Sequence, residues 1–163
     1  MTSCSSGSGV SSRVVSSTRG GAPGLTWQLD VFERGCRRLT FTPPLQPLAG
    51  YEPMVHQMLC SKSPSLTDEK SDSPLELLAV GRQGTRQVVA IDADPSIKAI
   101  VLDGKRRLRP SSGSVFVDVG AAVPKTVEFH ETNSSGHCRR ERYASTELWW
   151  LNCTYQSNTP ITP

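Results

Sequence analysis

Residues 75–91, LELLAVGRQGTRQVVAI, contain two apolar runs separated by a glycine-rich segment. Each run is rich in Leu, Val and Ile and has the length of a single strand. The segment Gly81-Arg82-Gln83-Gly84 is typical of a tight turn, so the chain from Gln87 to Ile91 is expected to run back beside the first run. This stretch therefore predicts a β-hairpin.

Strand patterns recur on both sides of this hairpin. Upstream, apolar residues alternate with polar ones over 25–31 and 38–41, and Thr42-Pro43-Pro44 is expected to end the second strand. Downstream, Asp103-Gly104 can occupy both positive-φ positions of a type I′ turn, which would pair the strand before it with residues 105–109. The same alternation appears at 115–119, 127–129 and 148–155.

About nine strand candidates with almost no helical pattern predict an all-β fold, either an antiparallel β-sandwich or a jelly-roll-like barrel. One short helix is expected over 52–60, because Met54, Val55 and Met58 fall at helical spacing. No strand–helix–strand unit is evident, which argues against a doubly wound nucleotide-binding fold.

A chain of 163 residues suits one domain. Twelve of the first 22 residues are Ser or Gly, so residues 1–22 are predicted to form a flexible arm before a single β domain at 23–163. Within that domain, residues 61–74, SKSPSLTDEKSDSP, predict a flexible polar loop.

Apolar patterning and cysteine count predict where the protein resides. No run approaches the roughly 20 apolar residues that span a bilayer, and residues 1–22 lack the apolar core of a secretion signal. Five cysteines is an odd number, so Cys36 and Cys153 are interpreted as free, packed thiols. These features predict a soluble intracellular protein, cytoplasmic or part of a virion. Asn133-Ser134-Ser135 and Asn152-Cys153-Thr154 match the N-glycosylation pattern and are then interpreted as chance matches.

The net charge of +3 is unevenly distributed along the chain. Residues 1–50 carry five basic and two acidic side chains, residues 51–80 two and five, and residues 81–120 seven and four. Two short clusters concentrate the basic charge, one after the Asp103-Gly104 turn and one in the segment HCRRERY, interpreted as a loop. Cations beside aromatic rings can bind the phosphates and bases of single-stranded nucleic acid. The nucleic-acid-binding candidates are Lys105, Arg106, Arg107, Arg109, Arg139, Arg140, Arg142 and Tyr143.

Metal binding and catalysis receive less support from the sequence. Candidate metal ligands are His56, Cys60, His130, His137, Cys138 and Cys153, but their spacing is looser than that of zinc frameworks. A cysteine paired with His130 or His137 would be the minimal nucleophilic arrangement, and no nucleophile elbow or Walker loop occurs. Asp92 and Asp94 could hold a divalent cation, but they fit a turn equally well. We predict no catalytic residue, metal, cofactor or small-molecule substrate.

One local resemblance carries no function. Residues 94–102, DPSIKAIVL, resemble a strand segment of enoyl-CoA hydratase-like proteins. The Gly-rich acyl-CoA-binding segment that follows in that family is replaced here by Lys105–Pro110, and the chain is too short for that fold. No residue or activity is carried over.

The overall layout is similar to small structural β-sandwiches, including viral coat-type jelly rolls. It predicts a non-catalytic structural or interaction module that forms homo-oligomers, with basic loops and the arm facing a partner chain or RNA. Two alternatives stay open: an RNA- or single-strand-binding β domain that uses the basic clusters, and a small Cys/His metal protein or enzyme.

Overall fold

The computed structural model describes residues 13–55, 58–59, 74–110, 113–142 and 148–156, and the statements below concern these residues. They form strands joined by short turns, with two single-turn 3-10 helices, η1 (Glu33–Gly35) and η2 (Glu52–Val55). The strands are β1 (Val14–Ala22), β2 (Leu25–Phe32), β3 (Arg37–Thr42), β4 (Met58–Leu59), β5 (Leu75–Gln83), β6 (Arg86–Ala93), β7 (Ala99–Leu102), β8 (Arg106–Leu108), β9 (Val115–Gly120), β10 (Thr126–His130), β11 (Ser135–Arg142) and β12 (Trp149–Gln156).

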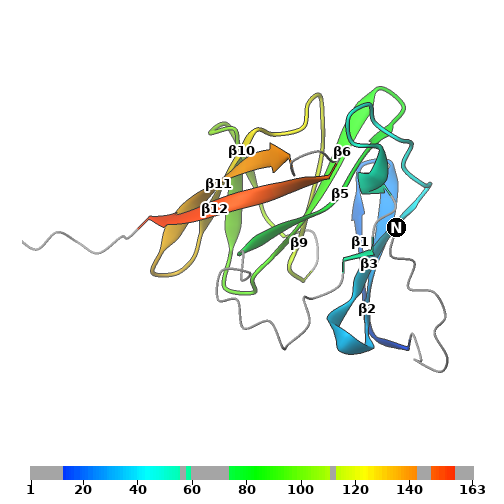
Figure 1. Cartoon of the computed structure of the whole chain (residues 1–163), viewed down its shortest axis with the longest axis horizontal. Helices are drawn as coiled ribbons and strands as arrows, with labels where there is room; N and C mark the ends of the chain where they lie inside the picture. The colour runs from blue at the N-terminus through cyan, green and yellow to red at the C-terminus, as the bar shows by residue number, and fades with distance from the viewer. Residues whose placement is uncertain (1–12, 56–57, 60–73, 111–112, 143–147, 157–163) are drawn as a thin grey trace, which may run out of the picture.

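All strand pairs are antiparallel, and the described strands belong to three sheets. The first sheet has the order β1-β2-β3-β4, the second β5-β6-β9, and the third β12-β11-β10-β7-β8. In Figure 1 the blue first sheet lies on one side, the green strands β5 and β6 in the middle, and the orange β11 and β12 on the other side. The predicted all-β, sandwich-like fold is confirmed, and these sheets do not close into a barrel.

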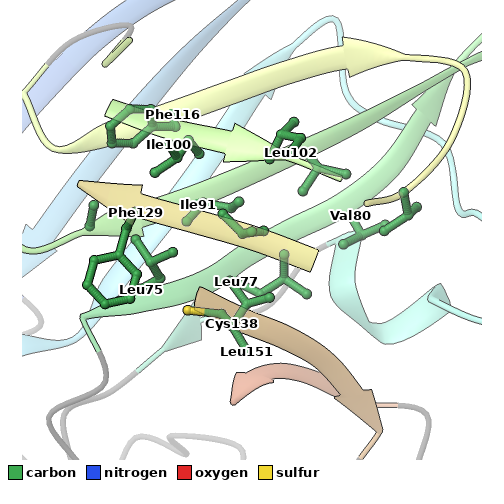
Figure 2. Close-up of a cluster of buried hydrophobic side chains, with 14 of the residues drawn as sticks. Leu75, Leu77, Val80, Ile91, Ile100, Leu102, Phe116, Phe129, Cys138 and Leu151 are labelled. Atoms are coloured by element: carbon green, nitrogen blue, oxygen red, sulfur yellow. The ribbon is translucent and has the colours of Figure 1, made fainter. Parts of the chain in front are cut away.

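The second sheet is the middle layer, because its strands bury side chains on both faces. Leu77, Val89, Ile91 and Phe116 contribute to a core shared with the third sheet (Figure 2). Residues of the opposite alternation, among them Leu78, Val88, Ala90, Val115 and Val117, contribute to a separate core with the first sheet. Strands buried on both faces have continuous apolar sequence, which explains the unbroken runs of β5 and β6.

The outer layers each seat an aromatic ring over a glycine on a neighbouring strand. Trp27 of β2 is the register partner of Gly20 of β1, and Phe129 of β10 is the partner of Gly136 of β11. A Cβ atom on either glycine would lie 2.3 Å from the facing ring, closer than real contacts allow. Both rings are buried, so glycine is required at these two positions for the ring to reach the core.

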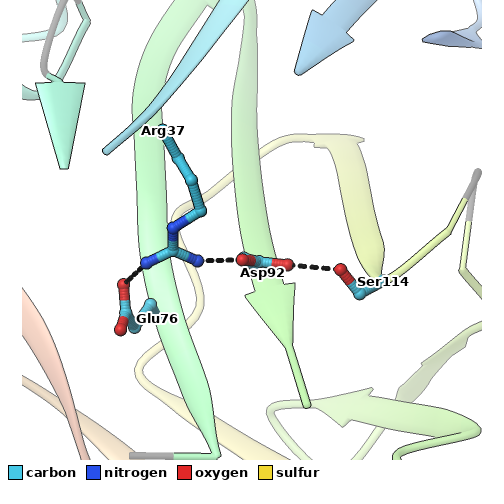
Figure 3. A network of polar contacts seen from close by, with 4 residues as sticks. All are labelled: Arg37, Glu76, Asp92 and Ser114. Carbon is cyan, nitrogen blue, oxygen red and sulfur yellow. Dashed lines mark hydrogen bonds and ion pairs between the residues drawn. The ribbon is translucent and has the colours of Figure 1, made fainter. Parts of the chain in front are cut away.

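Polar contacts also tie the layers together. Arg37 of β3 forms ion pairs with Glu76 of β5 and Asp92 of β6 (Figure 3). The Ser114 hydroxyl donates a hydrogen bond to Asp92 at 2.6 Å. Glu76 and Asp92 face each other across the β5–β6 ladder, so one guanidinium neutralises two neighbouring carboxylates.

Two turn predictions are met to different degrees. Asp103 and Gly104 have φ of 50° and 68°, and Lys105 N–H donates to the Leu102 carbonyl at 3.0 Å, which confirms the predicted turn between β7 and β8. The β5–β6 hairpin is also confirmed, but its turn is at Gly84 and Thr85 rather than Gly81–Gly84. Gly81 remains in β5 because Leu45 and the Gln46 carbonyl pack closely against it.

The helix predicted over 52–60 is wrong. Of the described residues in this range, Glu52–Val55 form the 3-10 turn of η2, and Met58 and Leu59 form strand β4 beside β3. Met54 and Val55 are buried, but in two different cores, so the apolar spacing arose without a helix. No helix in the described part of the chain is long or apolar enough to cross a bilayer.

Two segments predicted to be irregular contain strands. Residues 14–22, assigned to the flexible arm, form β1, which pairs with β2 at Val14 and from Ser16 to Ala22, with a register shift between Val14 and Ser16. HCRRERY, interpreted as a loop, supplies most of β11. Residues 1–12 of the arm and 61–73 of the polar loop lie outside the described residues, and Pro74 is buried.

The cysteine prediction is wrong as well. Cys138 and Cys153 face each other across the β11–β12 ladder and form a disulfide. Cys36 is also disulfide-bonded. Cys36 and Cys153 are therefore not free thiols, and the odd cysteine count concealed a pairing that depends on strand register.

Candidate interaction surface

The outer face of the first sheet is a grid of polar residues on three adjacent strands. Each row contains one residue from each of the three strands β1, β2 and β3, and the three residues lie side by side. The rows are Ser17, Asp30 and Arg38; Arg19, Gln28 and Thr40; and Gly21, Thr26 and Thr42. We call these nine residues the polar grid.

Asp30 is the centre of hydrogen bonding in the polar grid. Its Oδ1 accepts from Ser17 Oγ at 2.6 Å and from Gln28 Nε2 at 2.8 Å, and its Oδ2 lies 3.6 Å from Arg38 Nη2. The Ser17 hydrogen bond, helped by Gln28 and Arg38 and opposed by burial, holds the pKa of Asp30 below its ordinary value. Asp30 therefore stays ionised to a lower pH than an ordinary aspartate and anchors its neighbours in the polar grid.

An open hollow of about 740 Å³ lies over the polar grid. Its lining includes the guanidinium groups of Arg19 and Arg38, and Arg19 Nε donates to Gln28 Oε1 at 2.9 Å. Thr26, Thr40 and Thr42 are exposed. Hydroxyl, amide and guanidinium groups of this kind suit a hydrated, hydrogen-bonding partner rather than an apolar ligand.

Strand β1 is one edge of this sheet, and it is long and almost uncharged. Among the described strands none pairs with its outer side, and Arg19 is its only charged residue. Val14 and Val15 are 41% and 59% exposed. Long exposed edges with free backbone groups are sites where another strand can pair.

The edge of the middle sheet lies close to the edge of the first. Strand β1 contacts β9, and the Thr18 methyl would lie 3.6 Å from a Cβ atom on Gly113, just before β9. Strand β9 also has no partner on its outer side among the described strands. Two layers thus end side by side at β1 and β9.

Strand β12, one edge of the third sheet, has eight residues and no charge, but it contacts β5. The remaining described edges are short or covered. Strand β4 has two residues and β8 three, and β8 carries Arg106 and Arg107, the usual protection of an edge by charge. The end of β5 forms two backbone hydrogen bonds between Gln46 and Arg82, both at 2.9 Å. β5 is also contacted by β12.

The basic residues of the β7–β8 hairpin are all exposed, but one of them is held by an ion pair. Lys105, Arg107 and Arg109 are exposed. Arg106, whose side chain is 47% exposed, forms an ion pair with Asp118, a buried carboxylate on β9. Burial raises the pKa of Asp118 although Arg106 opposes this shift, so the ion pair compensates only part of the desolvation.

Arg140 of β11 is also an internal residue. Its Nη1 donates to the carbonyls of Val123 and Pro124 at 3.0 and 3.3 Å, and its guanidinium lies over the rings of Tyr51 and Trp149 at 5.5 and 5.0 Å. Trp149 Nε1 donates to the Gly50 carbonyl at 2.8 Å, so this arginine and its two aromatic rings hold a loop against β11 and β12. These two rings stack on protein rather than on bases.

The remaining β11 candidates do not join the β8 cations into one basic surface. Arg139 is exposed, 3.4 Å from Glu141, and Arg142 is exposed and has a partner within the protein. Tyr143 lies outside the described residues. Strands β7 and β10 separate β8 from β11, and exposed Glu128 of β10 lies in the row between Arg107 and His137. The outer face of the third sheet is therefore mixed in charge.

The metal and nucleophile candidates are not brought together in the described part of the chain. Cys138 and Cys153 are bonded to each other as a disulfide, and no group of three side chains that could ligate a metal occurs among the described residues. His56 and Cys60 lie outside them. Asp92 forms an ion pair with Arg37. Asp94 Oδ1 accepts a hydrogen bond from the backbone N–H of Ser96 at 3.1 Å, as expected of an aspartate in a turn.

No protein-family model matches the chain, and neither a characterised protein nor a solved structure shows significant similarity to it. The surface must therefore be interpreted from its own chemistry.

Sequence reasoning missed the polar grid and the open edge. The alternation of 25–31 already places Thr26, Gln28 and Asp30 on one outward face. Their neighbours on β1 could not be assigned, because the Ser- and Gly-rich sequence of β1 carries no strand signal. Pairing with β2 and the packing of Trp27 against Gly20 order this strand.

Proposed function

We propose that this chain is a non-catalytic structural module that self-associates through the β1 edge of its first sheet. The observation that carries the proposal is the nine-residue open edge of β1 beside the open edge of β9. Pairing of β1 with β1 of a second copy would continue the first sheet across the interface and is compatible with two-fold symmetry.

A second copy is the occupant that best fits the chemistry of β1. Its single charge, Arg19, limits repulsion between two identical strands, and Ser16, Ser17, Gly20 and Gly21 leave room for close backbone approach. Val14 and Val15 would lose solvent exposure in the pair. The polar grid would be extended by the second copy, because its β1 rows adjoin the interface.

The test is light scattering coupled to size exclusion, over a concentration series of the 17.7 kDa chain and two lysine variants. Val15→Lys places like charges at the pairing edge and should weaken association by at least about tenfold, or 1.4 kcal/mol. Leu148→Lys changes an exposed apolar residue away from β1 and should leave association intact. A strict monomer at every concentration, or equal weakening by both variants, would refute the proposal.

We also propose that the chain matures in an oxidising compartment, or on a virion exposed to one, in place of the predicted cytoplasm. Every described cysteine, namely Cys36, Cys138 and Cys153, is disulfide-bonded. Disulfides persist mainly in secreted, surface or lumenal proteins.

Nucleic-acid binding is the second candidate function, and one observation favours it: Lys105, Arg107 and Arg109 are exposed on one hairpin. Binding through them should weaken steeply with salt and be lost in a Lys105→Gln/Arg107→Gln variant, which spares the Arg106–Asp118 pair. Arg139→Gln is the matched control. Absence of salt-sensitive binding to single-stranded RNA removes this candidate.

A further inference from the structure

The β10–β11 turn carries a tripeptide whose chemistry the proposed function does not use. Asn133, Ser134 and Ser135 form an Asn-x-Ser sequence, the acceptor pattern for N-linked glycans. The disulfides support this interpretation of the Asn-x-Ser pattern, because the compartments in which disulfides form include those in which N-linked glycans are attached. We propose that Asn133 is an N-glycan acceptor site.

The local structure presents Asn133 outward. The four residues that join β10 to β11 are closed by a hydrogen bond from Glu131 N–H to the Ser134 carbonyl, at 2.8 Å. Ser134 Oγ donates to Glu131 Oε2 at 2.9 Å, which fixes the turn from the other side. Asn133 is exposed at the tip, and among the described residues its amide donates to no protein group. A glycan there would displace no contact of the fold.

The second match, Asn152-Cys153-Thr154, is placed differently. Asn152 is exposed but lies within strand β12, and its Nδ2 donates to Glu141 Oε1 at 3.2 Å. Cys153, the middle residue, is fixed to Cys138 by the disulfide. A glycan on Asn152 would replace an existing hydrogen bond, so Asn133 is the site that the fold favours.

The modification needs a lipid-linked oligosaccharide diphosphate as donor. A bond forms between Asn133 Nδ2 and the anomeric carbon of the first sugar, and the bond from that carbon to the lipid diphosphate breaks. The amide loses one proton, and the leaving diphosphate takes the electron pair. The glycan would project from the third sheet, on the opposite side of the middle layer from β1, so it is compatible with pairing through β1.

This inference rests on the proposed oxidising compartment and not on self-association. The full chain is secreted from cells that N-glycosylate, with a cleavable leader added, and is treated with peptide N-glycosidase. Peptide mass mapping should show Asn133 converted to Asp after treatment, with most copies modified before it. Non-reducing mapping of the same sample reports the Cys138–Cys153 bond, so loss of the glycan and failure of the compartment proposal are distinguishable.

Variants at the same turn sharpen the test. Ser135→Ala removes the acceptor pattern and should abolish the modification, whereas Ser135→Thr preserves the pattern and should retain it. Asn152→Gln is the control and should leave Asn133 modified. Disulfide-bonded protein without a glycan at Asn133, or with one only at Asn152, would overturn the inference.

Discussion

At the scale of single residues, two adjacent glycines in β1 have different surroundings. A Cβ atom on Gly20 would lie 2.3 Å from the Trp27 ring, whereas the nearest atom to one on Gly21 is the Leu25 carbonyl oxygen at 3.8 Å. Gly20→Ala should therefore lower the free energy of unfolding by about 1–3 kcal/mol through overpacking. Gly21→Ala should change it by no more than about 0.5 kcal/mol. Urea denaturation followed by tryptophan fluorescence measures both; equal effects would contradict the packing of Trp27 on Gly20.

Two adjacent arginines in β11 provide a second comparison. Arg140→Lys keeps the charge but loses the planar fork that reaches two carbonyls and two rings, so it should cost about 1–3 kcal/mol of unfolding free energy. Arg139→Lys should cost about 0.5 kcal/mol or less, since the Arg139 side chain is 70% exposed beside Glu141. Thermal unfolding of both variants checks this, and a larger loss for Arg139→Lys would show that the internal role of Arg140 is misassigned.

Two carboxylates should affect the pH dependence of stability with opposite signs. The pKa of Asp30 is lowered by folding, so its contribution is present above the unfolded pKa near 3.8 and is lost as pH falls through the folded value. The pKa of Asp118 is raised by burial, so its contribution is present below 3.8 and is lost as pH rises through the folded value.

Replacement by asparagine removes each titration. From about pH 3 to about pH 6, the stability of Asp30→Asn relative to the natural chain should fall, while that of Asp118→Asn should rise. Urea unfolding across this range gives both differences, with the natural chain as the reference in every buffer. Slopes of the same sign would contradict the environments assigned to these two groups.

At the scale of elements, the disulfide joins β11 and β12 directly. Cys138 is fully buried, and the bond closes a loop with a sequence separation of 15. Cys138→Ala/Cys153→Ala should lower the free energy of unfolding by about 3 kcal/mol, chiefly because the unfolded chain regains the conformational entropy that the cross-link removes. Chemical denaturation without reductant measures this loss. Alkylation of both thiols in the unreduced native protein would show that the bond is not formed.

Prediction of strands and turns from sequence succeeded where burial of one face produces a periodic pattern of apolar residues. Strand β2 alternates because one face is buried, and the turn at Asp103-Gly104 follows from two positive φ angles. It failed for β1 and β11, because the Ser- and Gly-rich sequence of β1 and the basic sequence of β11 lack the apolar alternation that marks a strand, although both pair with strands close in sequence. It also failed for η2, because two separate cores, rather than one helical face, bury Met54 and Val55.

The candidate surface was less predictable than the fold. Basic residues were identified by their spacing, but sequence alone does not reveal that Arg106 pairs with Asp118 or that Arg140 lies over the rings of Tyr51 and Trp149. These contacts join segments that only the stacking of sheets brings together. The polar grid likewise depends on the register of three strands.

At the scale of the whole molecule, the three stacked sheets differ in which faces they bury and which they expose. The middle sheet is buried on both faces and connects the two cores. The third sheet presents a mixed-charge face and the turn that carries Asn133. The first sheet presents the polar grid and ends in β1, whose outer side pairs with no other described strand, and it is the layer through which we propose assembly.

Hydrogen–deuterium exchange of the unmodified chain at high and low protein concentration tests assembly through β1 most directly. Backbone amides of 14–22 should exchange more slowly at high concentration, because pairing with a second copy protects N–H groups at the β1 edge. Amides of β12, on the third sheet, should exchange equally at both concentrations. Unchanged exchange across 14–22, or protection confined to another strand, would contradict assembly through β1.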